Sequence, residues 1–263
     1  MTNRIFTFTG TGNAFAIARR LADGLGDTEV LRMSPRAPDV TGVERIGLVF
    51  PVFGWGMPRM AMEFVRSLRV GPGQYVFAVA TCAGSHAKTL VQTRKSLRAG
   101  GSDLHAGFAV LGEFHISFPG SKPLAIIRLM SWLSRNDRPA LFAERADEII
   151  EAVVEKRSHA VETTGPLANM LGALVNGAAR ESFRKADRAF ASTDACVSCG
   201  ICERVCPREN VTLEGGRPAW HHDCEFCYAC VAWCPRNAIT LGGCAPEAPA
   251  HHPDVTVDDV VWR

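Results

Sequence analysis

Two cysteine runs constrain this chain more than any other feature: CVSCGICERVCP at residues 196–207 and CEFCYACVAWCP at residues 224–235. Every cysteine of the second run lies 28 residues after its counterpart in the first, as Cys224 does after Cys196. The similarity continues beyond the cysteines, because PRENVTLEGG at 207–216 aligns with PRNAITLGG at 235–243. A fixed offset indicates an internal duplication. We therefore expect each half to be a cysteine loop followed by a short β-strand.

Such closely spaced thiols serve disulfides, zinc or iron–sulfur clusters. Disulfides belong to oxidising compartments, but the N-terminus MTNRIFTFTG lacks the charged start and apolar stretch of a signal peptide. We therefore expect a cytoplasmic chain with reduced thiols. Zinc takes four ligands, so a third cysteine at the same spacing and a Cys-Pro have no purpose there. A cubane cluster needs both features, and we favour iron–sulfur ligation over zinc and over unligated thiols.

The two runs resemble those of bacterial ferredoxins with two [4Fe-4S] clusters, over residues 191–244. In that pattern the fourth cysteine of each run ligates the other cluster. The resemblance implies a first cluster held by Cys196, Cys199, Cys202 and Cys234. It implies a second cluster held by Cys224, Cys227, Cys230 and Cys206.

The rest of the 263 residues are expected to form a globular domain, since the chain is 47% hydrophobic and 21% charged. Strand-like apolar segments alternate with helical patterns between residues 4 and 111. Alternation of this kind predicts an α/β fold, a doubly wound parallel sheet with helices on both faces and ligands beyond the carboxyl ends of the strands. Helical spacing is clearest in two sets of apolar residues: Ala14, Ile17, Ala18 and Leu21, and Ala87, Leu90, Val91 and Leu97.

The loop after the first predicted strand reads TGTGNA, residues 9–14. A dinucleotide fingerprint would need a glycine where Phe15 stands, and a Walker A loop would need Gly-Lys-Ser/Thr. The loop instead combines glycines and hydroxyl groups at the start of a helix, which suits a phosphate held by backbone N–H groups. Taken alone, it is also typical of a plain turn with an N-cap.

Two further strand-end loops, PVFGWGMP at 51–58 and TCAGSH at 81–86, suit a planar ring system. Together with the phosphate loop they resemble the flavodoxins over about residues 1–160, although Ala14 stands where that family has threonine. The resemblance implies FMN and a five-stranded sheet, with Trp55 stacking on the flavin ring and the Gly54 peptide near its N5 atom. The residues implied to contact FMN are Thr9, Gly10, Thr11, Gly12, Asn13, Ala14, Pro51, Val52, Phe53, Gly54, Trp55, Thr81, Cys82, Ala83, Gly84 and His86.

Several residues near these motifs have simpler interpretations. Cys82 is interpreted as a small packed thiol rather than a redox group. His86 fits an early helix position beside a Ser85 cap as well as it fits a hydrogen bond to flavin. We expect His251 and His252 to be solvated tail residues rather than ligands. Cys244 lies outside both cysteine runs, and no Ser/His/Asp or paired-carboxylate arrangement predicts catalytic residues for hydrolysis.

The whole chain is similar to flavodoxin–ferredoxin fusion proteins of anaerobic bacteria and archaea, which share a terminal His-Pro segment like HHPDVTV at 251–257. The predicted divisions are a flavodoxin-like FMN domain at 1–160, a helical linker at 161–190, a two-cluster ferredoxin domain at 191–244 and a tail at 245–263. The linker is expected to be a helix with one apolar face, formed by Leu167, Met170, Leu171, Leu174 and Val175.

Charge is divided unevenly, because residues 1–190 hold 24 Lys/Arg and 17 Asp/Glu whereas residues 191–263 hold 5 and 10. Opposite potentials steer association, so the basic domain is expected to dock its own acidic cluster domain or an acidic ferredoxin. PLAIIRLMSWL at 123–133 is too short to span a membrane and carries Arg128, and we interpret it as one face of a packed helix. Nothing in the sequence resembles a nucleic-acid-binding module.

These observations favour electron transfer between two [4Fe-4S] clusters and FMN, with a ferredoxin or an oxidoreductase as redox partner. A flavin-dependent reductase that uses cluster electrons on a small substrate is the alternative, and a redox-responsive regulatory module is a third. The oligomeric state, the reduction potentials and the direction of electron flow stay open at this point.

Overall fold

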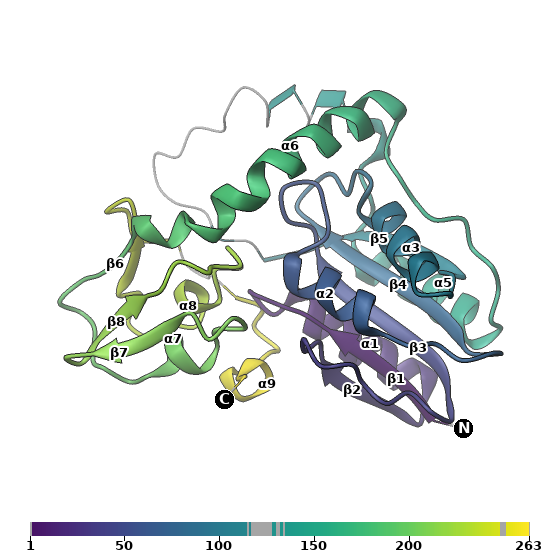
Figure 1. Ribbon diagram of the computed structural model, residues 1–263, viewed down its shortest axis with the longest axis horizontal. Coiled ribbons are helices and arrows are strands. Elements are labelled where there is room, and N and C mark those ends of the chain that lie inside the picture. Colours follow the sequence, from purple (N-terminus) through teal and green to yellow (C-terminus); the bar gives the residue numbers. More distant parts are fainter. Residues whose placement is uncertain are drawn as a thin grey trace.

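A parallel five-stranded sheet forms the N-terminal part of the protein (Figure 1). The computed structural model describes residues 2–114, 116, 128–129, 132–133, 135–247 and 251–262. The sheet has the order β2-β1-β3-β4-β5, which is the flavodoxin-like doubly wound order, so the predicted fold class is confirmed. Its strands are β1 (Thr2–Thr7), β2 (Thr28–Arg32), β3 (Val43–Pro51), β4 (Tyr75–Cys82) and β5 (Ala106–Leu111).

Helices cover both faces of this sheet. One face packs against α1 (Asn13–Leu25) and α5 (Phe142–Val154), and the other against α2 (Arg59–Ser67) and α3 (Thr89–Ala99). The stripe predicted for the first helix is buried as expected, at Ala14, Ile17, Ala18 and Leu21.

The stripe predicted for α3 is wrong at two positions. Helix α3 begins at Thr89, so Ala87, with φ of 43°, lies before it, and Val91 is 39% exposed. Thr89 donates its N–H to the carbonyl of His86 at 3.0 Å, which makes residues 86–89 a turn. The buried residues of α3 are Thr89, Leu90, Thr93 and Leu97. His86 precedes the helix and does not occupy an early helix position.

The cysteine-rich part repeats one small unit. Its elements are β6 (Phe190–Ser192), α7 (Ile201–Arg204), β7 (Val211–Glu214), β8 (Arg217–Trp220), α8 (Ala229–Ala232) and β9 (Ile239–Leu241). Helix α8 begins 28 residues after α7, and the duplication seen in the sequence is thus present in the backbone. Strand β6 pairs with β9 and β7 with β8, both antiparallel, as in ferredoxin-like domains.

Helix α6 (Pro166–Arg184) runs along one side of the molecule from the sheet to the cysteine-rich part (Figure 1). The apolar face predicted for it is wrong, because Leu167, Met170 and Leu174 are 52%, 52% and 66% exposed. The residues that face the protein are instead small or carry side-chain amides: Ala168, Asn169, Gly172 and Asn176. The amide groups form hydrogen bonds with other side chains and with backbone carbonyl groups. These hydrogen bonds take the place of apolar contacts in the packing of the helix.

One hydrophobic core continues from the sheet into the cysteine-rich part. Phe8 and Phe50 of the sheet side belong to the same buried cluster as Val205 and Trp233. The chain end joins it through Val260 of the short helix α9 (Val257–Val260). Because burial of apolar surface is the main stabilising contribution in folding, this common core helps to hold the two parts together.

The interpretation of residues 123–133 as a packed helix falls mainly outside the described residues. Arg128, Leu129, Trp132 and Leu133 are described, and Trp132 is 59% exposed. Among the helices that the structure describes, none combines the length and the apolar character needed to cross a bilayer.

Candidate functional site

The loop between β1 and α1 leaves a row of backbone donors without protein partners. The Gly12 N–H donates to Oγ1 of Thr9 at 3.0 Å, which turns the chain into the helix. Within the described part of the chain, no protein group accepts from the N–H groups of Thr11, Asn13 or Ala14. Buried backbone donors are almost always paired, and Ala14 is 1% exposed. These donors at a helix N-terminus therefore fit an anionic group such as a phosphate.

The side chain of Asn13 holds this loop to the loop that follows β5. Its Oδ1 accepts from the N–H groups of Glu113 at 3.2 Å and Phe114 at 3.1 Å, and its Nδ2 donates to the Phe114 carbonyl. Oγ1 of Thr11 donates to the same carbonyl at 3.2 Å. Two strand-end loops that are far apart in sequence are thereby joined, and the Asn13 amide serves the protein rather than a ligand.

A cavity of about 170 Å³ lies at the carboxyl ends of β1, β3, β4 and β5. Most of the residues implied to contact FMN line it: Thr9, Gly10, Thr11, Asn13, Ala14, Pro51, Val52, Phe53, Thr81, Cys82 and Ala83. Gly12, Gly54, Trp55, Gly84 and His86 were named with them but are not among its lining residues. The lining residues not foreseen are Gly112, Phe114, Ile116, Cys227 and Tyr228.

A tight turn follows β3 beside this cavity. Phe53 and Gly56 exchange two backbone hydrogen bonds of 2.9 and 3.1 Å, and the two residues between them, Gly54 and Trp55, have φ of 52° and 61°. Positive φ at both central positions is the type I′ hairpin geometry. Phe53 lines the cavity and packs edge-on against Phe8, with ring centroids 5.9 Å apart. Of the two aromatic residues in this loop, Phe53 lines the cavity and Trp55 does not.

Cys82 is buried at the end of β4. Burial raises the pKa of its thiol to about 11, so the group stays protonated at neutral pH. Both observations agree with the interpretation of Cys82 as a packed thiol.

The cysteines of the first implied set lie next to one another. Cys196, Cys199, Cys202 and Cys234 all line one small cavity next to β9. The pKa of Cys202 is raised to about 11, first by burial and then by the neighbouring thiols of Cys199, Cys234 and Cys196. A cysteine of the second run thus lies with three cysteines of the first.

The second implied set is grouped in the same way and is more deeply buried. Burial is the main cause that raises the pKa of the Cys227 thiol well above its usual value, and Cys224, Cys206 and Cys230 are its thiol neighbours. Backbone N–H groups point at sulfur atoms of both sets, from Asn210 to Cys206 at 3.3 Å and from Ala238 to Cys234 at 3.3 Å. Thiols that lie in two groups of four and receive backbone N–H donors fit cluster ligation.

The second cysteine loop touches the phosphate loop directly. A Cβ atom on Gly10 would lie 2.1 Å from the carbonyl oxygen of Cys227, so no side chain fits there. The indole Nε1 of Trp233 donates to the Gly10 carbonyl at 2.8 Å, and the bond is buried. Cys227 itself lines the 170 Å³ cavity. The two candidate sites therefore share a wall.

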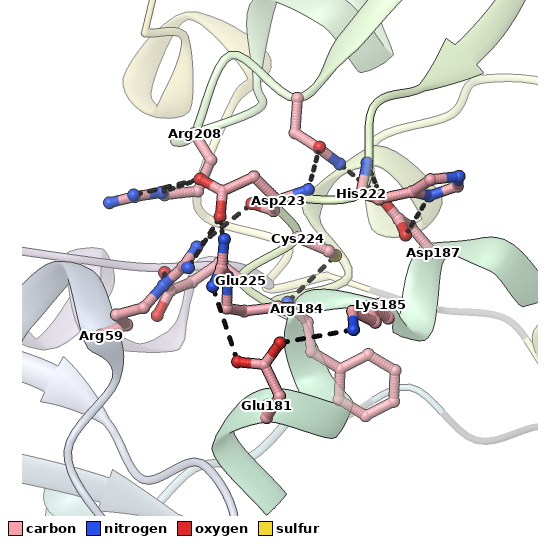
Figure 2. Close-up of polar contacts among 12 residues, drawn as sticks. Arg59, Glu181, Arg184, Lys185, Asp187, Arg208, His222, Asp223, Cys224 and Glu225 are labelled. Carbon is pink, nitrogen blue, oxygen red and sulfur yellow. Dashed lines mark hydrogen bonds and ion pairs between the residues drawn. The ribbon is translucent and has the colours of Figure 1, made fainter.

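Ion pairs cross the same interface, and Figure 2 shows them around Asp223. Arg59 of α2 forms an ion pair with Asp223 at 2.7 Å. Arg208 forms two ion pairs, one with Asp223 at 3.1 Å and one with Glu63 of α2 at 2.6 Å. The N–H of Met60 donates to buried Glu225 at 3.2 Å. Charges of both signs come from both sides of the interface, so the contact is more mixed than the uneven division of charge along the sequence indicates.

The chain end closes over the phosphate loop. His252 donates its N–H to the Thr11 carbonyl at 2.8 Å, and its ring packs against Phe114 with centroids 5.0 Å apart. The ring of His251 stacks on Trp233 at 4.2 Å. The expectation that both histidines are solvated tail residues is wrong, because the tail packs on the interface instead of extending into solvent.

Residues 195–239 match the family described as the 4Fe-4S dicluster domain. No curated protein matches the chain. Among solved structures, a short-chain flavodoxin associated with a PDU bacterial microcompartment is 15% identical, with a TM-score of 0.39, and the match covers 60% of this chain and 99% of that one.

An azoreductase from Bacillus anthracis str. Sterne is 10% identical, with a TM-score of 0.31, and the match covers 65% of this chain and 100% of that one. Because both scores are low, the assignment of the sheet rests on its strand order. The chain thus joins a flavodoxin-like sheet to a ferredoxin-like 4Fe-4S domain.

Proposed function

We propose that this protein is an electron carrier in which iron–sulfur clusters exchange single electrons with FMN. The observation that carries the proposal is the shared cavity, because the phosphate loop lines it together with Cys227 and Tyr228 of the second cysteine loop. When bound, the clusters supply single electrons and FMN accepts one or two. The role of the protein is to hold the two sites in contact.

FMN is the flavin that the phosphate loop fits best. The N–H groups of Thr11, Asn13 and Ala14 would hold a terminal phosphate monoester, and Phe53 would contact the ring system. The cofactor released from protein purified without oxygen should therefore be FMN rather than riboflavin or FAD, as mass spectrometry would show. Recovery of FAD as the main flavin would contradict the assignment of the loop.

Two clusters with crossed ligands agree with the way the thiols are grouped. Cys206 belongs to the first run but lies with Cys224 and Cys227 of the second. Cys206→Ser should therefore change the electron paramagnetic resonance spectrum of the reduced protein in the same way as Cys224→Ser. A spectrum that matches Cys196→Ser instead would show that each run holds its own cluster.

The two clusters would have different roles. Cys227 of the second set lines the cavity, whereas no cysteine of the first set does. Cys199 is exposed, and its neighbour Val197 is 57% exposed, so the first set lies near the surface. The first cluster would thus be the outer port, which meets a ferredoxin or another redox protein, and the second would be the inner one.

A dilution experiment tests the carrier function. When two sites belong to one chain, each meets the other at a fixed effective concentration, which does not depend on the protein concentration in solution. After rapid reduction of the clusters without oxygen, the flavin absorbance should fall at a rate that is independent of protein concentration. A rate proportional to concentration would mean that electrons pass between molecules.

One observation favours the alternative of a flavin-dependent reductase. A larger hollow of about 520 Å³ adjoins the first cavity, and the two share Asn13, Gly112 and Phe114. It has room for a small substrate beside the phosphate loop. Rapid reoxidation of the reduced protein by one small molecule with saturation kinetics would favour this function over that of a carrier.

A further inference from the structure

The two cysteine loops have the same backbone conformation at equivalent positions but carry different residues there. Ser198 and Gly200 of the first loop have φ of 57° and 73°. Phe226 and Tyr228, which follow them by 28 residues, have φ of 55° and 59°. The left-handed conformation suits glycine and is an outlier for a bulky residue. The first loop meets this requirement with Gly200, whereas the second places a tyrosine there.

The location of Tyr228 supplies a reason for keeping an unfavourable residue. Tyr228 lies between Cys227 and Cys230 and lines the strand-end cavity, whereas Gly200 does not. It is held in place by rings of its own domain, Phe226 at 4.6 Å and Phe190 at 6.0 Å between centroids. Strained backbone is concentrated at sites where a side chain has to be presented to a ligand.

We propose that Tyr228 is a flavin-contact residue that the cluster domain contributes to the FMN site. The inference rests on the proposed function and deepens it, because the FMN site would then be built from both domains. A tyrosine offers a flat, rigid surface that recognises a planar ring system by stacking and apolar contact. The flavodoxin-like part supplies Phe53 and Phe114 to the lining of the cavity, and the cluster domain adds Cys227 and Tyr228.

The test uses the full-length chain with its clusters in place, freed of flavin and titrated with FMN. Tyr228→Gly copies the residue of the first loop, and Tyr228→Asn introduces another residue that tolerates positive φ. Tyr228→Phe keeps the ring. Phe226→Ser, which copies Ser198 and removes the ring at the other left-handed position, serves as the comparison variant. Phe226 stacks on Phe183 of α6 at 5.0 Å and is not among the lining residues of the cavity.

Flavin fluorescence gives the dissociation constant of FMN, and the iron content and the melting temperature are measured on the same samples. Tyr228→Gly and Tyr228→Asn should keep their iron and weaken FMN binding by about tenfold or more, which is about 1.4 kcal/mol. Tyr228→Phe should bind FMN within about threefold of the unchanged protein. Phe226→Ser removes a ring that packs on Tyr228, so it should weaken FMN binding less than Tyr228→Gly does.

Three results would overturn the inference and are distinguishable from one another. Unchanged FMN binding in Tyr228→Gly and Tyr228→Asn, together with a lower melting temperature, would make Tyr228 a packing residue only. Failure of the unchanged protein to bind FMN would overturn the proposed function itself. Loss of FMN affinity in Phe226→Ser equal to that in Tyr228→Gly would show that the whole loop, and not Tyr228, forms the contact.

Discussion

Gly10 is the residue at which the two redox sites meet. Its missing side chain makes room for the Cys227 carbonyl, and its own carbonyl accepts the indole N–H of Trp233. The same residue lines the cavity. One position in the phosphate loop thus lines the proposed FMN site and contacts the cluster domain.

Gly10→Ala should separate the two sites. The added Cβ would lie 2.1 Å from the Cys227 carbonyl oxygen, so the backbone would have to move. Overpacking of this kind costs about 1–3 kcal/mol. We expect a lower melting temperature and a slower fall of flavin absorbance after cluster reduction.

The matched control is Gly84→Ala, in another strand-end loop. A Cβ there meets nothing within 4 Å, and no change in either measurement is expected. If Gly10→Ala behaved like Gly84→Ala, the phosphate loop would not be the point of docking.

Cys82 should be chemically inert despite its place in the cavity. Burial raises the pKa of its thiol to about 11, and the thiolate is the reactive form. Alkylation followed by mass spectrometry should label exposed Cys244 at pH 8 and leave Cys82 unlabelled until the pH approaches about 11. Labelling of Cys82 at pH 8 in protein without flavin would contradict its assignment as a packed thiol.

At the scale of elements, α6 does more than connect two domains. Its Asn176, which is 4% exposed, donates from Nδ2 to the carbonyl groups of Gly54 at 3.1 Å and Phe53 at 3.3 Å. Gly56 has no room for a Cβ because Asn176 lies against it. The helix therefore fixes the turn after β3, in which Trp55 adopts a backbone conformation unfavourable for a bulky residue.

Asn176→Ala should loosen that turn. It leaves the Gly54 carbonyl without its donor, which costs about 1–3 kcal/mol where the group is buried. The Phe53 carbonyl keeps the Gly56 N–H at 3.1 Å. A lower melting temperature and a shifted flavin absorption spectrum are expected. Leu174→Ala, on the exposed side of the same helix, is the control and should change neither, since Leu174 is 66% exposed. Equal effects of the two substitutions would mean that the stability of helix α6, and not the contact of Asn176 with the turn, causes the change.

At the scale of the whole molecule, the two parts are joined by a common core and by charges around Asp223. Burial opposes ionisation of Asp223, but the guanidinium groups of Arg59 and Arg208 lower the pKa of its carboxyl below its usual value. Because the folded pKa lies below the unfolded one, this stabilisation is present at neutral pH and is lost as the pH falls through the folded pKa.

Asp223→Asn should weaken the interface. The Asp223 side chain is 38% exposed, so solvent screening limits the expected decrease in the free energy of unfolding to about 1 kcal/mol. The difference in melting temperature from the unchanged protein should shrink at about 1 M salt, where the screening length is about 3 Å.

Asp194→Asn removes an ion pair inside the cluster domain, with Arg217 at 2.9 Å, and serves as the control. Only Asp223→Asn should slow electron transfer between clusters and flavin. The same slowing in both variants would place the effect within the cluster domain rather than at the interface.

Local sequence patterns predicted the elements and the groups that each brings to the site. The buried stripe of α1 follows from Ala14, Ile17 and Leu21, because helical periodicity records which side is covered. The α3 stripe was misplaced because a turn at residues 86–89 delays the start of that helix. The face of α6 was mistaken because the amide of Asn176, and not an apolar side chain, makes its contact.

What the sequence by itself determined is the presence of two cysteine loops and a phosphate loop, because each is encoded within a few consecutive residues. Tertiary structure alone decided that Gly10 meets Cys227, that Tyr228 lines the cavity and that His252 covers the phosphate loop. The contacts of Gly10 with Cys227 and of Thr11 with His252 join residues that are more than two hundred positions apart in the sequence. No local spacing records such a contact, because it depends on how the surfaces of two separately encoded domains fit together.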